Sequence, residues 1–402
     1  MHEEFIEKLK HGKLRFHEID KMVGATKAIQ LRRAAVSELT GIELKHINNF
    51  SFDAEDVVSR NIENMIGAVQ IPLGVAGPLL VNGEYARGRY YIPLATTEGA
   101  LVASVNRGCS VITANGGANV RIFKDEMTRA PVFRVKDIAS ARKLVDWVNT
   151  NFQRLKEKAE ETTRFGRLLS VNTFVTGRNV FLRFAYDTGD AMGMNMVTIA
   201  TDAAVDLILE ENDVELVALS GNMCTDKKPS AINSILGRGK TVCADVVLDE
   251  DIIQKKLKTT PKRMAEVNYR KNMIGSGRAV SLGFNAHAAN VAAAMFIACG
   301  QDTAHVVEAS NAITTMELTD EGLYCSITLP SLAVGTVGGG TGIVTQKECL
   351  EMLGVAGAGN PPGTNSKKLA EIIAASILAG EISLIGALSA RHLAKAHAQL
   401  GR

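Results

Sequence analysis

The sequence predicts an α+β fold with three parts: a small helical N-terminal region, a large mixed helical and β domain, and a ferredoxin-like domain inserted into it. Two observations predict this division. Residues 131–218 alternate between strand-like and helix-like runs in the order β-α-β-β-α-β, which is the ferredoxin-like arrangement. Apolar helical spacing and glycine-rich loops occupy the chain on both sides. We therefore expect parts at 1–66, at 67–130 together with 219–402, and at 131–218.

The N-terminal region, residues 1–66, is dense in charge and helical in pattern. Its apolar residues recur at helical spacing, at Ala28, Leu31, Ala35 and Leu39. Gly41 follows as a helix stop signal. The pattern fits either an arm that packs on a partner subunit or an ordinary pair of surface helices.

The first half of the large domain opens with a glycine- and proline-rich segment at 71–79. Such a segment allows the backbone to approach a ligand or another strand closely. An alternating strand is expected at 84–92. Thr96 or Thr97 is a good N-cap for the helix that follows, so Glu98 is expected in the first turn of that helix. The apolar face of this helix is expected to consist of Leu101, Val102, Val105, Cys109 and Ile112.

The inserted domain is expected to begin with a strand at 132–135 and a helix at about 138–161. A hairpin follows around Gly177 and Arg178, then a helix and a last strand. The ranges expected for these elements are 168–176, 179–186, 194–210 and 214–219.

The second half of the large domain is expected to be mostly helical beyond residue 230. An alanine-rich helix is predicted at 284–299, with Asp302 just past its end. Two final helices are expected, separated near Gly380, and the last of them carries His392 and His397.

Composition narrows the class of protein. The chain has 45 Lys and Arg against 43 Asp and Glu, which gives no support for a nucleic-acid binder. The most apolar run, 286–299, is too short to span a bilayer. The N-terminus lacks the features of a signal peptide, and the six cysteines form no CxxC pair. These features predict a soluble cytoplasmic protein with reduced thiols and no membrane partner.

The loop at 220–233 is the strongest candidate for chemistry. It places Asp226 beside Lys227 and Lys228, and Pro229 favours an extended backbone at the residue before it. Two ammonium groups held in this way suit anion binding and the stabilisation of negative charge on a carbonyl oxygen. The alternative is a solvated charge cluster in a surface turn.

Common nucleotide and metal motifs are missing from the sequence. It has no GxGxxG between a strand and a helix and no P-loop. The glycine-rich run at 335–342 could cradle phosphates through backbone N–H groups, and a helix N-terminus near 190–196 could bind an anion. His392 and His397 are five residues apart and there is no HExxH, so no metal site is expected.

A set of longer motifs carries a family resemblance. They are ENMIG at 63–67, PLGVAGP at 72–78, ATTEG at 95–99, DAMGMN at 190–195, TDKKP at 225–229, GQD at 300–302 and GTVGGGT at 335–341. Together they resemble the 3-hydroxy-3-methylglutaryl-coenzyme A (HMG-CoA) reductase family, in a soluble archaeal-type form of its class I branch. The resemblance covers nearly the whole chain from about Glu63, and the TDKKP loop favours class I over class II.

The resemblance implies a four-electron reduction of HMG-CoA to mevalonate and free CoA, through mevaldehyde, with two NADPH. It also implies catalytic roles. Lys227 would stabilise the alkoxide, Glu98 would deliver a proton to the aldehyde, and Asp302 would bridge these two residues. His397, near the chain end, would protonate the departing CoA thiolate.

Binding roles follow from the same resemblance. The acyl group and its free carboxylate would be held by Arg129, Ser220, Asp226, Lys228, Lys271 and Asn290. CoA would be contacted by Ser104, Asn106, Arg107 and Lys258. The nicotinamide cofactor site would include Asp190, Met192, Gly193, Met194, Asn195, Gly338, Gly339 and Gly340. The 2′-phosphate of NADPH would be met by Thr163 and Arg164.

The resemblance further implies a homodimer with its active site at the subunit interface, or a homotetramer. The inserted domain would then bind NADP(H), and the large domain HMG-CoA and CoA. Two alternatives stay open from the residues themselves. One is a Schiff-base lyase that uses Lys227, and the other is a CoA- or nucleotide-binding regulatory protein without chemistry.

Overall fold

The long helix α16 (Thr364–Ser389) lies at the centre of the largest core. The computed structural model describes residues 2–390. Within that range, α16 is the one helix that is long and apolar enough to cross a bilayer, with a mean hydropathy of 1.9 over an 18-residue window. However, 89% of this window is buried inside the fold, so α16 is the core helix of the large domain.

The prediction of two final helices separated near Gly380 was wrong, because α16 runs unbroken through this residue. A Cβ atom at Gly380 would lie 2.7 Å from Val291 Cγ2 and 3.3 Å from His287 Nε2. The glycine therefore lets α16 pack closely against α13 (Ala288–Ala298) and is not a helix stop.

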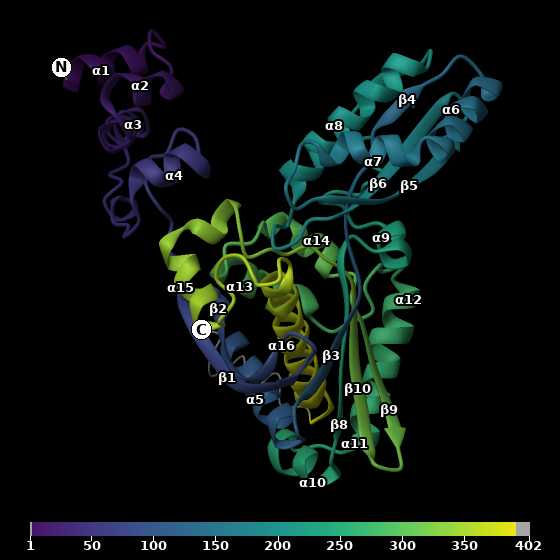
Figure 1. Ribbon diagram of the computed structural model, residues 1–402. Coiled ribbons are helices and arrows are strands. Elements are labelled where there is room, and N and C mark those ends of the chain that lie inside the picture. Colours follow the sequence, from purple (N-terminus) through teal and green to yellow (C-terminus); the bar gives the residue numbers. More distant parts are fainter. Residues whose placement is uncertain (1, 391–402) are drawn as a thin grey trace.

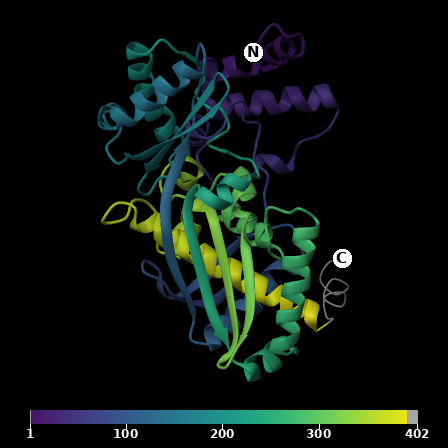
Figure 2. The ribbon, with the colours of Figure 1, turned by 90° about the vertical axis from the view of Figure 1, so that its right-hand side faces the viewer.

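A long sheet covers α16 (Figures 1 and 2). Its strands follow the order β7-β4-β6-β3-β8-β10-β9. The strand β3 (Ala118–Arg129) pairs with β8 (Gly239–Leu248) along most of its length, and its last residues pair with β6. The hairpin of β1 (Leu73–Asn82) and β2 (Arg87–Ala95) joins β3 through Val81 and Asn82. One strand thus connects the large domain to the inserted unit.

The expected α+β class is confirmed, but residues beyond 230 are less helical than expected. Three long strands lie there: β8, β9 (Ile313–Thr319) and β10 (Gly322–Leu332). Buried and half-buried side chains alternate along β8, since one of its faces packs on the core. Most of the half-buried positions are small or β-branched residues, which weakens the alternation in the sequence.

The inserted unit has the expected order of elements, β-α-β-β-α-β, with its first helix divided in two. Asn151 divides it: its backbone is not helical (φ −100°), and its side-chain amide donates to the carbonyl of Trp147. The four strands form an antiparallel sheet in the order β7-β4-β6-β5 over a separate core that includes Phe133, Leu182 and Phe184. The elements are β4 (Val132–Arg134), α6 (Ile138–Thr150), α7 (Phe152–Glu160), β5 (Arg167–Thr176), β6 (Asn179–Asp187), α8 (Met194–Glu211) and β7 (Glu215–Ala218).

The N-terminal helices lie apart from the main body in Figure 1 and have a small core of their own. The buried Arg32 holds them together through Asp20 and the carbonyl of Phe16. A second small cluster, which includes Met65 and Ile343, joins them to the body. These elements are α1 (His2–Lys10), η1 (Phe16–Glu18), α2 (Ile19–Val23), α3 (Ala25–Thr40), η2 (His46–Asn48) and α4 (Ala54–Arg60).

Two helix starts differ from the prediction. Helix α5 (Leu101–Ala114) begins after Ala100, whose backbone is left-handed, so Glu98 precedes the helix and is not in its first turn. Helix α13 begins at Ala288 and not at 284, because Phe284 forms a bridge with Ile313. The remaining elements of the described chain are α9 (Ala231–Leu236), α10 (Glu250–Ile252), η3 (Ile253–Leu257), α11 (Pro261–Val267), η4 (Asn268–Gly275), α12 (Ser276–Arg278), η5 (Thr303–His305), α14 (Val306–Ala309), η6 (Gly339–Gly342) and α15 (Val344–Met352).

Candidate active site

A cavity of about 1100 Å³ lies where the inserted unit meets the large domain. Four segments that are distant in sequence line much of it: the turn before α8, the loop before α9, the segment 300–303, and the glycine-rich run that enters η6. Many predicted site residues share this cavity. They are Arg129, Met192, Gly193, Met194, Asn195, Asp226, Lys227, Asp302, Gly338, Gly339 and Gly340.

The loop between β7 and α9 has an unusual backbone. Asn222, Thr225 and Lys227 all have left-handed φ angles, of 62°, 57° and 59°. Such angles disfavour residues other than glycine, so contacts elsewhere must hold the loop in this form. Thr225 is buried and bonded to Asn233, and the hydroxyl of Thr128 donates to the carbonyl of Cys224 at 3.1 Å.

Lys227 and Asp302 form an ion pair at the cavity wall. The distance from Lys227 Nζ to Asp302 Oδ2 is 2.9 Å, and the two side chains are 45% and 32% exposed. The hydrogen bond that Lys227 donates to Asp302 raises the pKa of Lys227 above its ordinary value, although burial opposes this. Burial raises the pKa of Asp302, but the bond from Lys227 and the nearby His305 outweigh it and lower that pKa. The lysine is therefore a fixed cation at neutral pH.

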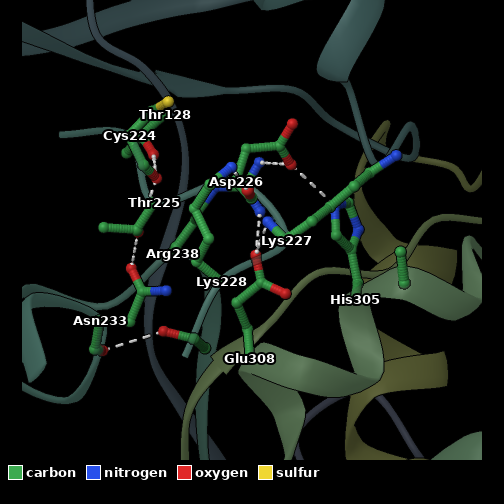
Figure 3. Close-up of polar contacts among 12 residues, drawn as sticks. Thr128, Cys224, Thr225, Asp226, Lys227, Lys228, Asn233, Arg238, His305 and Glu308 are labelled. Atoms are coloured by element: carbon green, nitrogen blue, oxygen red, sulfur yellow. Dashed lines mark hydrogen bonds and ion pairs between the residues drawn. The ribbon is translucent and has the colours of Figure 1, made fainter. Parts of the chain in front are cut away.

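A buried charge cluster supports the loop from behind (Figure 3). The guanidinium of Arg238, which is 0% exposed, donates to Asp226 Oδ1 at 2.9 Å and to Glu308 Oε1 at 3.0 Å. His305 Nε2 lies 3.1 Å from the same oxygen of Asp226. Burial raises the pKa of Asp226, but the His305 bond and the Arg238 charge outweigh it and hold that pKa at about 2. Asp226 is therefore an anion that anchors the loop.

Asp226, His305 and Glu308 are close enough together to hold a metal ion. However, Arg238 is bonded to both carboxylates. A fixed guanidinium charge in this place repels a second cation, so we interpret the cluster as an ion network and not as a metal centre.

The wall of the cavity at which the sequence predicts a cofactor exposes glycine backbone. Gly193 (φ 97°) is the N-cap of α8, and Met194, Asn195 and Met196 follow it along the cavity wall. Gly338 and Gly339 have positive φ angles, and a Cβ atom at either would meet nothing within 4 Å. Open glycine backbone beside a helix N-terminus suits a phosphorylated ligand that approaches closely.

Comparison with known proteins decides the family. Residues 28–402 match the family described as hydroxymethylglutaryl-coenzyme A reductase. The chain belongs to this family. It is 56% identical to the 3-hydroxy-3-methylglutaryl-coenzyme A reductase of Pyrococcus abyssi, over 100% of this chain and 99% of the relative. It is 55% identical to the reductase of the same name from Methanocaldococcus jannaschii, over 99% of both chains.

Family members of known structure share the fold. The class II reductase of Streptococcus pneumoniae, in a structure bound to NADPH, superposes with a TM-score of 0.66 at 20% identity, over 95% of this chain and 99% of that chain. At 20% identity, this structural similarity supports a shared fold and nothing further.

The structure does not place the other two predicted catalytic residues, Glu98 and His397, beside Lys227 and Asp302. Glu98 lies in the exposed turn after β2 and does not line the cavity, and its backbone N–H donates to Thr96 Oγ1 at 3.0 Å. Within the described part of the chain, Asp302 bonds Lys227 but does not bridge to Glu98. His397 lies outside the described residues.

Several predicted substrate residues also lie away from the cavity lining. Ser220 is bonded to Cys224, and Lys228 Nζ donates to the carbonyl of Asp226 at 2.8 Å. Lys271 is exposed on η4. Asn290 is half-buried in the first turn of α13.

The predicted CoA residues form a separate group around α5. Arg107 Nε and Ser104 Oγ both reach Ser383 Oγ on α16, at 3.0 Å and 2.9 Å. The side chain of Asn106 accepts from the N–H of Gly77 at 3.0 Å. Lys258 is exposed just after η3, which is bonded to α5 through Lys256 and Ser110.

Of the predicted cofactor residues, Asp190 is a buried anchor and does not line the cavity. Its carboxylate accepts the N–H groups of Gly359, Gly363 and Ser366 at 2.7 to 2.9 Å, which fixes the start of α16. Thr163 closes the turn before β5 by accepting from the N–H of Gly166 at 3.0 Å, and Arg164 is exposed beside it. A Cβ atom at Gly166 would lie 2.9 Å from Met196 Sδ, so this turn adjoins the cavity wall.

Sequence reasoning missed Arg238, His305 and Glu308. Two signals were present. Arg238 stands between two glycines just before a buried strand, and His305 and Glu308 follow Asp302 at helical spacing. Gln301 was also missed: it accepts from the N–H of Gly335 at 2.9 Å and so fixes the glycine-rich run.

Proposed function

We propose that this chain reduces HMG-CoA to mevalonate and free CoA, at the expense of two NADPH. The observation that carries the proposal is the Lys227–Asp302 pair, which shares one cavity with the glycine-rich run and the start of α8. A cation at the reacting carbonyl stabilises the negative charge that develops there, and open glycine backbone beside a helix N-terminus suits a phosphorylated cofactor.

The fixed charge of Lys227 suits it to the carbonyl oxygen, which becomes an alkoxide each time the carbon accepts a hydride. NADPH supplies the two hydrides when it is bound. Asp302 orients the ammonium and keeps it protonated, so the lysine stabilises negative charge without giving up its own proton at neutral pH. Arg129 lies at the same wall, 4.0 Å from Asp226, and would bind the free carboxylate of the acyl group.

The same ion pair argues against a Schiff-base lyase. A lysine that attacks a carbonyl must lose its proton, and enzymes lower its pKa for that purpose. Here the bond to Asp302 raises the pKa of Lys227. A binding protein without chemistry would not need a carboxylate in this position.

Reduction of the aldehyde and release of CoA each need a proton, and we assign both proton donors to residues other than Lys227 and Asp302. Glu98 would serve the aldehyde step, and His397 would protonate the CoA thiolate. The exposed position of Glu98 supports a homodimer in which its turn reaches the cavity of the other subunit. The adjacent hairpin exposes apolar side chains, among them Leu73, Val75 and Tyr91. Contact with a second subunit would remove this apolar surface from water.

We further assign the chain to class I and to the cytoplasm. The TDKKP loop at 225–229 supports the class. All six cysteines are free thiols, which fits a reducing compartment.

The reaction is tested by oxidation of NADPH in the presence of HMG-CoA. We expect two NADPH consumed for each CoA thiol released, and slower turnover with NADH because Arg164 would then lack its phosphate partner. Thioester binding without oxidation of either nucleotide would leave a binding protein and would contradict the proposal.

The shared site is tested by subunit mixing. Glu98→Gln and Lys227→Ala homodimers are each expected to be nearly inactive. Refolding them together should restore up to roughly a quarter of wild-type activity, because half of the dimers are mixed and one site in each carries no substitution. No recovery from a refolding mixture in which wild-type protein regains full activity would place both residues in one subunit.

A further inference from the structure

We infer that Glu308 is a positioning residue that sets the backbone and the aim of Lys227. The inference rests on the proposed role of Lys227 and adds a residue to it. Glu308 is 0% exposed, and its Oε1 accepts the backbone N–H of Lys227 at 2.7 Å (Figure 3). This contact spans 81 residues of sequence, so it ties the catalytic loop to a distant helix.

The backbone of Lys227 needs such a contact. Its φ angle of 59° is unfavourable for a residue that has a Cβ atom, so contacts elsewhere must hold it. A hydrogen bond from a backbone N–H to a carboxylate is among the stronger kinds. The bond to Glu308 therefore favours the left-handed conformation over the alternatives.

Glu308 and Asp302 hold the two ends of the same lysine. Asp302 bonds Nζ at 2.9 Å, and Glu308 bonds the backbone nitrogen at 2.7 Å. Both acids belong to one short segment that begins at η5, where Asp302 also accepts the N–H of Ala304 at 3.1 Å. Because one segment fixes both ends, the ammonium keeps its direction relative to the cavity.

A purely stabilising role does not explain why a buried glutamate occupies position 308. Its second oxygen, Oε2, is buried and has no hydrogen-bond partner within the described part of the chain. A buried carboxylate with an unsatisfied oxygen costs free energy, and its ion pair with Arg238 seldom recovers more than that cost. A well-packed apolar residue would serve a purely structural purpose better.

The test is a double-mutant cycle on kcat. In Glu308→Gln an amide oxygen can still accept from Lys227, so we expect about a 10-fold lower kcat, whereas Glu308→Ala should lose about 100-fold. NADPH affinity should change less than about twofold in both. When Lys227 is already replaced by Ala, the same substitutions at Glu308 should lower kcat by a further factor of less than about two, because Glu308 acts only through Lys227.

Glu371→Gln is the matched control, because Glu371 is another buried carboxylate that accepts backbone N–H groups, those of 84–86. Its effect on kcat should be the same with and without the Lys227 side chain. Fully additive losses for Glu308 and Lys227 would overturn the inference. If Glu308→Ala does not fold, the kcat values of Glu308→Gln with and without the Lys227 side chain test the inference.

A second readout needs no turnover. Amide hydrogen exchange at 222–229 should rise at least 10-fold in Glu308→Gln and stay unchanged in Glu371→Gln. Unchanged exchange in both variants would overturn the inference even in an active enzyme. An inactive wild-type protein would instead overturn the proposed reaction, and the exchange measurement would still decide the role of Glu308.

Discussion

Lys227→Ala is expected to lower kcat for HMG-CoA reduction by about 1,000-fold. Removal of one preorganised donor to a developing oxyanion commonly costs about 10²–10³ in kcat, and a charged donor belongs at the upper end of that range. The NADPH dissociation constant should change little, because the proposed cofactor site is the glycine-rich run and the start of α8. Steady-state kinetics and nucleotide titration measure the two effects separately.

Lys143→Ala is the control for this variant. Lys143 is an exposed lysine on α6, in the inserted unit, and does not line the cavity. It should keep wild-type kcat. A Lys227→Ala protein that retains more than a tenth of wild-type kcat would show that another group stabilises the alkoxide, and Arg129 would be the next candidate at the same wall.

Much of this site could be predicted from local motifs, because each motif forms one wall of the cavity. The TDKKP loop, the DAMGMN turn and the glycine-rich run are all short and contiguous, and they line one pocket. The residues that hold them in place could not be found in this way. Glu308, Arg238 and Asp226 are separated by up to 82 residues and meet only in the folded chain. Their burial as a charge cluster leaves no local pattern in the sequence.

The fold shows the same limit. The hairpin and the helix α8 in the inserted unit were placed within one or two residues, because each has its own periodicity and turn signals. Gly380 was misread, since a glycine within a helical pattern can mean a stop or a close contact. Only the position of His287 and Val291 on the neighbouring helix distinguishes the two.

Gly108→Ala is expected to destabilise the protein by about 3 kcal/mol, which is at the upper end of the usual cost of overpacking. A Cβ atom at Gly108 would lie 1.9 Å from the carbonyl oxygen of Ala379 and 2.8 Å from its Cα. These are backbone atoms of the buried helix α16, so neither helix can yield without moving the core. Urea unfolding, monitored by the fluorescence of Trp147 and by circular dichroism, measures the loss.

The effect should extend to the proposed CoA site, because α5 carries Ser104 and Arg107 and both are bonded to Ser383 on α16. If α5 is displaced outward, these bonds lengthen, and KM for HMG-CoA should rise several-fold while KM for NADPH stays constant. Gly277→Ala is the matched control: it is also a helical glycine, but its nearest contact would be an ordinary 3.9 Å to Phe284. The usual preference of helices for alanine should make that variant neutral or up to about 1 kcal/mol more stable. A Gly108→Ala protein as stable as Gly277→Ala would mean that α5 and α16 pack less closely than the structure has them.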